Sequence, residues 1–66
     1  MSDTYGIYLA KVKTCDKNIF GVKRTSKKTI IILQILKKEI RNKEDLSKAQ
    51  KAELSRRISK KMLDFI

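Results

Sequence analysis

A run of seven residues near the middle of the chain combines cations with hydroxyl groups. The segment Lys23 to Thr29, KRTSKKT, holds four basic and three hydroxyl-bearing residues directly before an apolar run. If Thr25 or Ser26 caps a helix, Lys27 and Lys28 occupy its first turn, where the dipole is already positive and acids are favoured. A bound anion would compensate, because free backbone N–H groups, hydroxyls and basic side chains together form a phosphate site. We therefore expect this segment to contact phosphates; the alternative is a flexible basic junction.

A second set of cations lies near the C-terminus, in the stretch SRRISKKMLDFI. On a helix, its two basic pairs cluster opposite the apolar face and could lie along a phosphate backbone. Glu53 precedes Arg57 by four residues and Asp64 follows Lys60 by four, so two of the cations have possible partners within the helix. The alternative is therefore a solvated helix face, and we expect only a secondary phosphate contact here.

Aromatic side chains are few, and two lie close to basic residues. A single-strand binder would alternate exposed rings with cations. Tyr5 and Tyr8 lie close to Lys11 and Lys13 in the sequence, which hints at such a pattern. We nevertheless expect Tyr8 and Phe20 to fill the core. The sequence shows no RNA-recognition sheet motif, G-x-x-G clamp, zinc finger or helix-turn-helix, so phosphate contacts without base reading are expected. The candidate nucleic-acid-binding residues are Lys11, Lys13, Lys23, Arg24, Thr25, Ser26, Lys27, Lys28, Arg56, Arg57, Lys60 and Lys61.

The residue types that support enzymatic or metal chemistry are scarce. The chain has no histidine, one cysteine and seven scattered acids. No nucleophile–base pair, metal cluster or glycine-rich nucleotide loop can be assembled from them. We expect no enzymatic activity, no cofactor, no metal and no small-molecule substrate, and we expect Cys15 to be structurally neutral.

Charge and size favour a polyanionic partner. The net charge is +10 on 66 residues, and residues 1–24, 25–42 and 43–66 carry +3, +4 and +3, so no single tail holds it. Such a field attracts nucleic acid first and anionic membranes second. A chain of this length forms one domain with a thin stability margin. No secretory signal or membrane span is visible, and we expect a soluble, cytoplasmic protein.

The first third of the chain predicts a β-hairpin over about residues 4–24. TYGIYLAKVK is rich in β-formers and places Tyr8, Ala10 and Val12 on one face of a strand. NIFGVKR places Phe20 and Val22 on the matching face, and TCDKN supplies turn residues between the two segments. This apolar face must pack on something else, because an isolated hairpin is marginal in water.

Two helices are predicted to cover that hairpin. TIIILQILKKEI has apolar residues at helical spacing and predicts a helix over about 26–41; its exposed part could need outside cover. Ser47 with Gln50 forms a capping-box pattern that opens a second helix over about 47–64, with an apolar face that includes Leu54 and Ile58. Alternatively, this helix begins near Asn42, with Glu44 and Asp45 at the positive end of its dipole. The predicted fold is a single α+β domain over 1–66, ββαα in order. Three strands followed by one helix is the alternative, with 29–36 as a strand.

We interpret the chain as a small basic nucleic-acid-binding protein that contacts the phosphates of structured RNA in a ribosomal or other ribonucleoprotein assembly. RNA is favoured over DNA because no groove-reading element is recognisable. The alternative is a protein-binding module, an inhibitor or adaptor that docks Ile31, Leu33 and Ile35 on a larger acidic partner. Membrane attachment through the C-terminal helix is less favoured, since its apolar face is needed to close the core.

Overall fold

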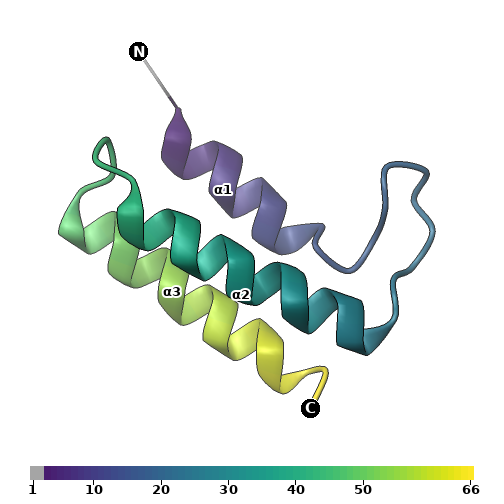
Figure 1. Ribbon diagram of the computed structural model, residues 1–66. Coiled ribbons are helices and arrows are strands. Elements are labelled where there is room, and N and C mark those ends of the chain that lie inside the picture. The colour runs from purple at the N-terminus through teal and green to yellow at the C-terminus, as the bar shows by residue number, and fades with distance from the viewer. Residues whose placement is uncertain (1–2) are drawn as a thin grey trace.

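The chain forms three helices, and the computed structural model describes residues 3–66 (Figure 1). Helix α1 spans Thr4–Lys13, α2 spans Ser26–Asn42 and α3 spans Lys48–Leu63. A loop of twelve residues, 14–25, joins α1 to α2, and a short turn, 43–47, joins α2 to α3. The short turn makes α2 and α3 antiparallel neighbours, as expected for such a connection.

Each helix begins at a residue whose side chain accepts a hydrogen bond from the first turn. The Gly6 N–H donates to Asp3 Oδ1 (3.3 Å), and a side chain at Gly6 would collide with the Asp3 carboxylate. The Lys28 N–H donates to Thr25 Oγ1 (3.3 Å), which confirms the predicted cap of α2. Before α3, Ser47 and Gln50 form the complete predicted capping box. The two predicted helices therefore begin where the capping patterns place them.

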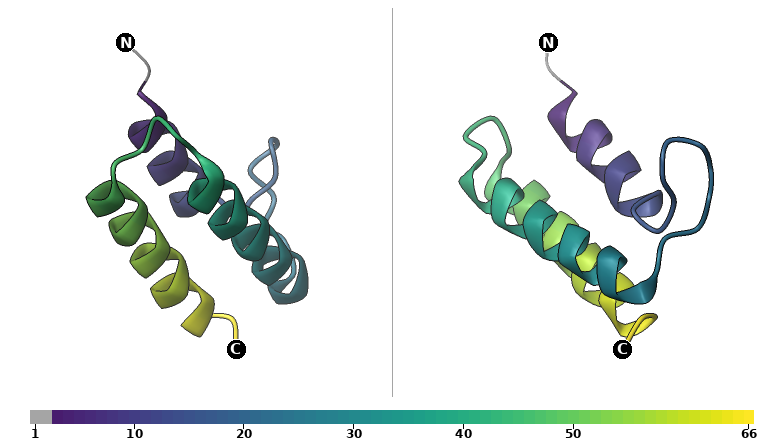
Figure 2. Two further views of the ribbon diagram at one scale, coloured as in Figure 1. Left: turned by 60° about the vertical axis from the view of Figure 1, so that its left-hand side comes forward. Right: turned by 45° about the vertical axis from the view of Figure 1, so that its right-hand side comes forward.

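The core lies where α1 packs against the antiparallel pair of α2 and α3 (Figure 2). Leu33 and Ile40 of α2 and Leu54 and Ile58 of α3 have no exposed surface. Leu46, the residue before the α3 cap, is also buried. The buried apolar side chains are Tyr8, Val12, Cys15, Leu33, Leu36, Ile40, Leu46, Leu54 and Ile58.

The predicted α+β fold is wrong, because residues 4–13 form a helix and the described residues 3–66 contain no strand. The alternative of three strands is wrong as well, since residues 29–36 lie inside α2. Tyr8 and Val12 are buried together, as predicted, but a spacing of four residues is shared by a strand face and a helix face. A strand would bury Ala10 beside Tyr8 and Val12, but Ala10 is exposed, and Leu9 instead packs against the core. This pattern has the period of a helix.

The second half of the predicted hairpin is a projecting loop. Its only β-type pairing among the described residues is an isolated antiparallel bridge between Lys17 and Lys23. Phe20 and Val22, predicted to face the core, are 82% and 59% exposed. Gly21 has a φ of +75°, a left-handed conformation that reverses the chain within this short loop. The apolar face that Tyr8, Ala10, Val12, Phe20 and Val22 were predicted to share therefore does not form.

Candidate nucleic-acid interface

The N-terminus of α2 is the part of the segment KRTSKKT that keeps unpaired donors. Ser26, Lys27 and Lys28 are exposed, and the first turn of α2 contains no acid. Thr25 satisfies only the Lys28 N–H, so the N–H groups of Ser26 and Lys27 have no acceptor in the described chain. Two backbone donors, one hydroxyl and two ammonium groups thus stand together at the positive end of a helix dipole.

Two other members of this segment, Thr29 and Arg24, make contacts within the protein, whereas the side chain of Lys23 is exposed. The Thr29 hydroxyl is fully buried and donates to the Thr25 carbonyl (2.9 Å). One guanidinium nitrogen of Arg24 donates to the Cys15 carbonyl (3.2 Å), and the Arg24 backbone N–H donates to the Asp16 backbone carbonyl (2.6 Å). Arg24 therefore fixes the loop to the end of α1 and offers only its remaining guanidinium donors to a ligand.

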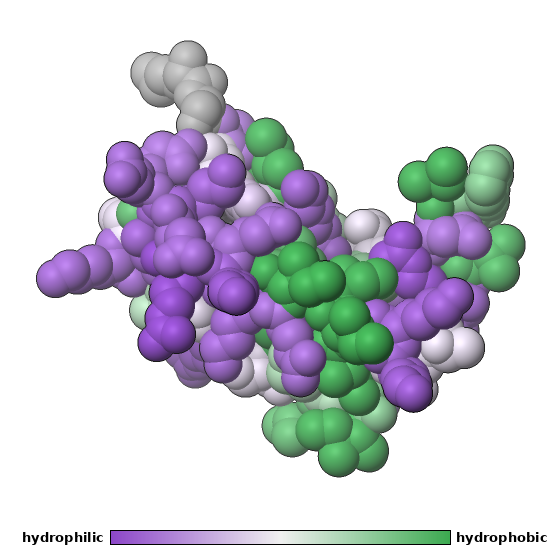
Figure 3. All heavy atoms as spheres, viewed as in Figure 1, coloured by the Kyte–Doolittle hydropathy of each residue, from purple (hydrophilic) through white to green (hydrophobic). Residues whose placement is uncertain are grey.

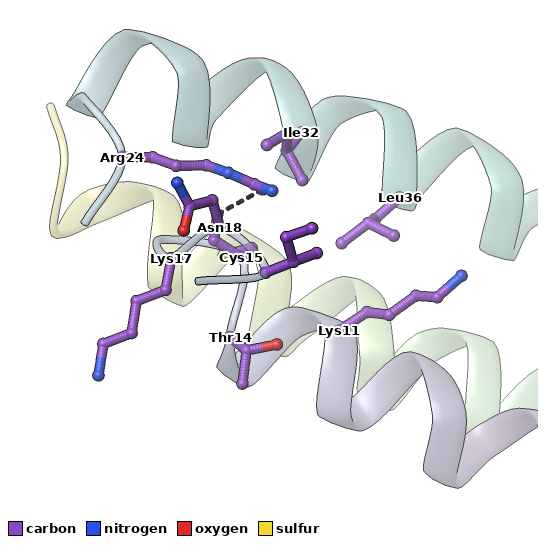
Figure 4. A pocket seen from close by; sticks show the side chains of 9 residues that line it. Lys11, Thr14, Cys15, Lys17, Asn18, Arg24, Ile32 and Leu36 are labelled. Atoms are coloured by element: carbon purple, nitrogen blue, oxygen red, sulfur yellow. Dashed lines mark hydrogen bonds between the residues drawn. The ribbon is translucent and has the colours of Figure 1, made fainter. Parts of the chain in front are cut away.

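Arg24 also borders a cavity of about 420 Å³ between the end of α1, the 14–25 loop and α2. Figure 4 shows the Arg24 side chain reaching toward Ile32 and Lys17 pointing away from the cavity. Ile32 and Leu36 supply the apolar wall on α2, and Lys11 lies on the opposite side. The cavity has three cations and no acid in its lining, so it favours anionic over cationic groups.

The four cations of α3 do not form one stripe. Arg57 Nε donates to Glu53 Oε1 at 3.1 Å, which confirms the first predicted pair. The second predicted pair, Lys60 with Asp64, makes no ion pair in the described chain. Lys61 Nζ donates instead to the Lys13 carbonyl at the end of α1 (2.9 Å). Two of the four cations are thus committed to contacts within the protein.

Lys13 meets three of the α3 cations at a smaller cavity. This cavity, of about 200 Å³, lies between α1 and α3 and is lined by Lys13, Arg57, Lys60 and Lys61 together with Asp64 and apolar residues of α1. The fold therefore joins two candidate sets that lie far apart in the sequence. Arg56 does not line this cavity, so the structure does not bring all four α3 cations together.

Lys11 lies apart from Lys13, against an aromatic ring. Its Nζ is 4.9 Å from the Tyr8 ring centroid, and Lys43 Nζ is 5.9 Å from the same ring. The Tyr8 hydroxyl donates to Glu39 Oε2 (3.0 Å). Burial raises the pKa of Tyr8 above its ordinary value, and the hydrogen bond to the Glu39 carboxylate acts in the same direction. Tyr8 is thus a core residue, as predicted, and offers no free ring face for a base.

A basic groove between α2 and α3 contains residues that the sequence prediction missed. It has a volume of about 560 Å³ and is lined by Gln34, Lys37, Lys38, Arg41 and Ser55. Lys37 and Lys38 form a basic pair that Arg41 follows within one helical turn. The pair Arg56 and Arg57 on α3 is likewise followed by cations one turn later. The α2 sequence alone does not predict the groove, because it does not show which part of α3 lies beside these cations.

Other kinds of site are not found in the described part of the chain. Residues 3–66 contain no group of three or more His, Cys, Asp or Glu that could hold a metal ion. Within the same range, no helix combines the length and the apolar character that crossing a bilayer requires. Cys15 is buried, and burial raises the pKa of its thiol, although the nearby Lys61 opposes the shift.

Comparison of the chain with protein-family models, with curated proteins and with solved structures finds no match. Functional inference therefore depends on the residues of this chain and their geometry.

Proposed function

We propose that the protein is a small basic nucleic-acid-binding protein that contacts the phosphate backbone of structured RNA within a ribosomal or other ribonucleoprotein assembly. The observation that carries the proposal is the charge distribution on α2. Its first turn presents Lys27 and Lys28 without an acid, and its second half lines the basic groove with three cations and no acid. A helix that is cationic at both ends can follow a row of phosphates.

The geometry of α2 supports a continuous contact. At about 100° per residue, Lys27, Gln34, Lys38 and Arg41 fall within about 60° of one another on the helix circumference, opposite the buried Thr29 and Leu36. The row runs from Lys27 to Arg41 within this helix of 17 residues. At 1.5 Å per residue, it extends over roughly 20 Å. That length spans several consecutive phosphates, whereas the cations of α3 are divided between contacts with the protein and the α1–α3 cavity.

The test is the affinity for a structured RNA hairpin as a function of salt, measured by fluorescence anisotropy with a DNA duplex of equal length in parallel. We expect binding at low salt and a steep linear fall of log affinity with log salt, because phosphate neutralisation releases counterions. Tighter binding to RNA than to DNA is expected for a protein without a groove-reading helix. Unmeasurable binding at low salt, or affinity independent of salt, would contradict the proposal.

A second candidate, docking on a larger acidic protein, is supported by two exposed side chains of α2. Ile31 is 47% exposed and Ile35 is 52% exposed, whereas Leu33 is fully buried and cannot belong to a docking surface. Figure 3 shows apolar side chains gathered over this part of α2. The discriminating change is Ile35→Asp, because the position is exposed. Loss of function with RNA affinity intact would favour the protein partner.

A further inference from the structure

The tip of the 14–25 loop exposes three apolar side chains. Ile19 is 90% exposed, Phe20 is 82% exposed and Val22 is 59% exposed. The loop projects from the helices in each view, and apolar side chains gather at its end (Figures 1 to 3). Exposed apolar residues are common singly, but three within four positions on a projecting loop mark an interaction site.

The tip is held in shape by hydrogen bonds of its own backbone. Asn18 Oδ1 accepts from the N–H groups of Phe20 (2.9 Å) and Val22 (3.0 Å), and the Asn18 N–H donates to the Val22 carbonyl (2.9 Å). The Gly21 N–H donates to the Asn18 carbonyl (3.0 Å), and the bridge between Lys17 and Lys23 closes the base of the loop. These bonds fix the backbone with its apolar side chains in water, so insertion into a partner costs little further ordering.

Cations flank the tip in the sequence, with no acid between them. Residues 17–28 contain five basic residues and no Asp or Glu: Lys17, Lys23, Arg24, Lys27 and Lys28. Each basic residue held near an anionic lipid surface strengthens adsorption about fivefold. An apolar tip flanked by basic residues therefore matches a bilayer with anionic headgroups, in both charge and hydropathy.

Other occupants fit this tip less well. A nucleobase could stack on Phe20, but Ile19 and Val22 have no flat face for stacking and would remain in contact with a polar ligand. A protein would have to supply a pocket shaped to three side chains on a convex tip, whereas the acyl boundary of a bilayer adapts to the tip. The apolar face of α3 is not available to a membrane, because Leu54 and Ile58 are fully buried.

We propose that the 14–25 loop is a membrane-docking device: Ile19, Phe20 and Val22 insert into the headgroup–acyl boundary of an anionic bilayer while the surrounding lysines and Arg24 bind lipid phosphates. This is attachment to one leaflet, without a spanning segment. It does not depend on RNA binding, although both ligands would compete for Lys27 and Lys28.

The chain has no tryptophan, so Phe20→Trp places a single fluorescent reporter at the tip. Vesicles of phosphatidylcholine with phosphatidylserine should shift its emission to shorter wavelength, and brominated acyl chains should quench it. Vesicles of phosphatidylcholine alone should leave it unchanged. Ile7→Trp is the matched control, since Ile7 is an exposed aliphatic position on α1, and its emission should stay that of an indole in water.

A second pair of variants measures affinity by vesicle co-sedimentation. Phe20→Ser should weaken binding to anionic vesicles by about 10- to 100-fold, because this is the change in affinity expected when one large apolar side chain is no longer buried. Ile7→Ser should leave the affinity unchanged. Both positions are exposed, so circular dichroism should show intact helices. Equal binding of Phe20→Ser and wild type, or no emission shift of Phe20→Trp on bound vesicles, would overturn the proposal in favour of electrostatic adsorption alone. Quenching by RNA without a vesicle-induced shift would overturn it in favour of base stacking, and no response to either would leave a protein partner.

Discussion

Lys61 donates a hydrogen bond from Nζ to the carbonyl of Lys13 at 2.9 Å, across 48 positions of sequence. The contact joins the last turn of α3 to the last residue of α1, where the carbonyls have no partner within their helix. A charged donor here also complements the negative end of the α1 dipole. Lys61 thus stabilises the packing of α1 on α3, which is a different role from the phosphate contact that its sequence position predicts.

Lys61→Met should therefore lower the free energy of unfolding by about 1 kcal/mol, because the stem is retained and only the charge-assisted hydrogen bond is lost. Urea denaturation followed by circular dichroism measures the change. Lys60→Met is the matched control, since Lys60 has no hydrogen bond or ion pair in the described chain. Equal stability of the two variants would show that the Lys61 contact contributes nothing.

The two sides of α2 should differ sharply in their tolerance of truncation. Leu33→Ala should cost about 2–5 kcal/mol of stability, because Leu33 is fully buried and its loss leaves a cavity. Ile35→Ala should change stability by less than about 1 kcal/mol, since Ile35 is 52% exposed. Thermal unfolding of both variants tests the packing of α2, and similar losses would contradict it.

Asn18 should control the order of the projecting loop. Asn18→Ala removes the acceptor for the N–H groups of Phe20 and Val22, so both amides should exchange hydrogen faster with solvent. Asn18→Asp keeps an acceptor oxygen and should preserve their protection. Exchange measured by NMR distinguishes these results, and unchanged protection in Asn18→Ala would show that the side chain does not order the loop.

Stability should depend on pH above about 10 through Tyr8. Burial and the Glu39 carboxylate raise the pKa of Tyr8 in the folded protein, so the folded state retains the phenol proton after the unfolded chain has released it. The stabilisation is present in full below the unfolded pKa, near 10, and is lost as pH rises through the folded value. Urea midpoints between pH 8 and pH 11 should fall for the wild type and for Tyr5→Phe.

In Tyr8→Phe, which has no phenol to ionise at this position, the decline above pH 10 should be smaller. The difference between the variants isolates the contribution of Tyr8 from every other effect of high pH on stability. A decline in Tyr8→Phe as steep as that of the wild type would exclude Tyr8 as its source.

The parts of the fold that the sequence predicts correctly are those with an unambiguous local signal. Ser47 and Gln50 mark the start of α3, and the extension of the apolar period to Ile40 identifies α2. The first helix was missed because Tyr8 and Val12 satisfy both periods, and because Asp3 was not recognised as its cap. Tyr5 and Leu9, which pack on the core, complete the helical pattern.

The candidate site was predictable where one helix supplies all its groups. Thr25, Ser26, Lys27 and Lys28 are adjacent in sequence and remain adjacent at the start of α2. The diversion of cations to distant carbonyls, such as Lys61 to Lys13 and Lys51 to Arg41, depends on tertiary packing that the sequence pattern does not show. The exposure of the loop tip was not predicted either. Phe20 and Val22 were expected in a strand paired with residues 4–13, and those residues form a helix instead.

The central claim is that the start of α2 binds phosphate, and paired charge variants test it most directly. Lys27→Gln/Lys28→Gln and Lys43→Gln/Lys48→Gln each remove two positive charges, but the second pair flanks the α2–α3 turn, at the other end of α2. The measurement is the affinity for a structured RNA hairpin over a series of salt concentrations. We predict that the first variant loses about tenfold or more in affinity and that its log–log salt slope falls by about 1–2, while the second stays within about threefold of wild type. Equal losses in the two variants would contradict a phosphate site at the start of α2.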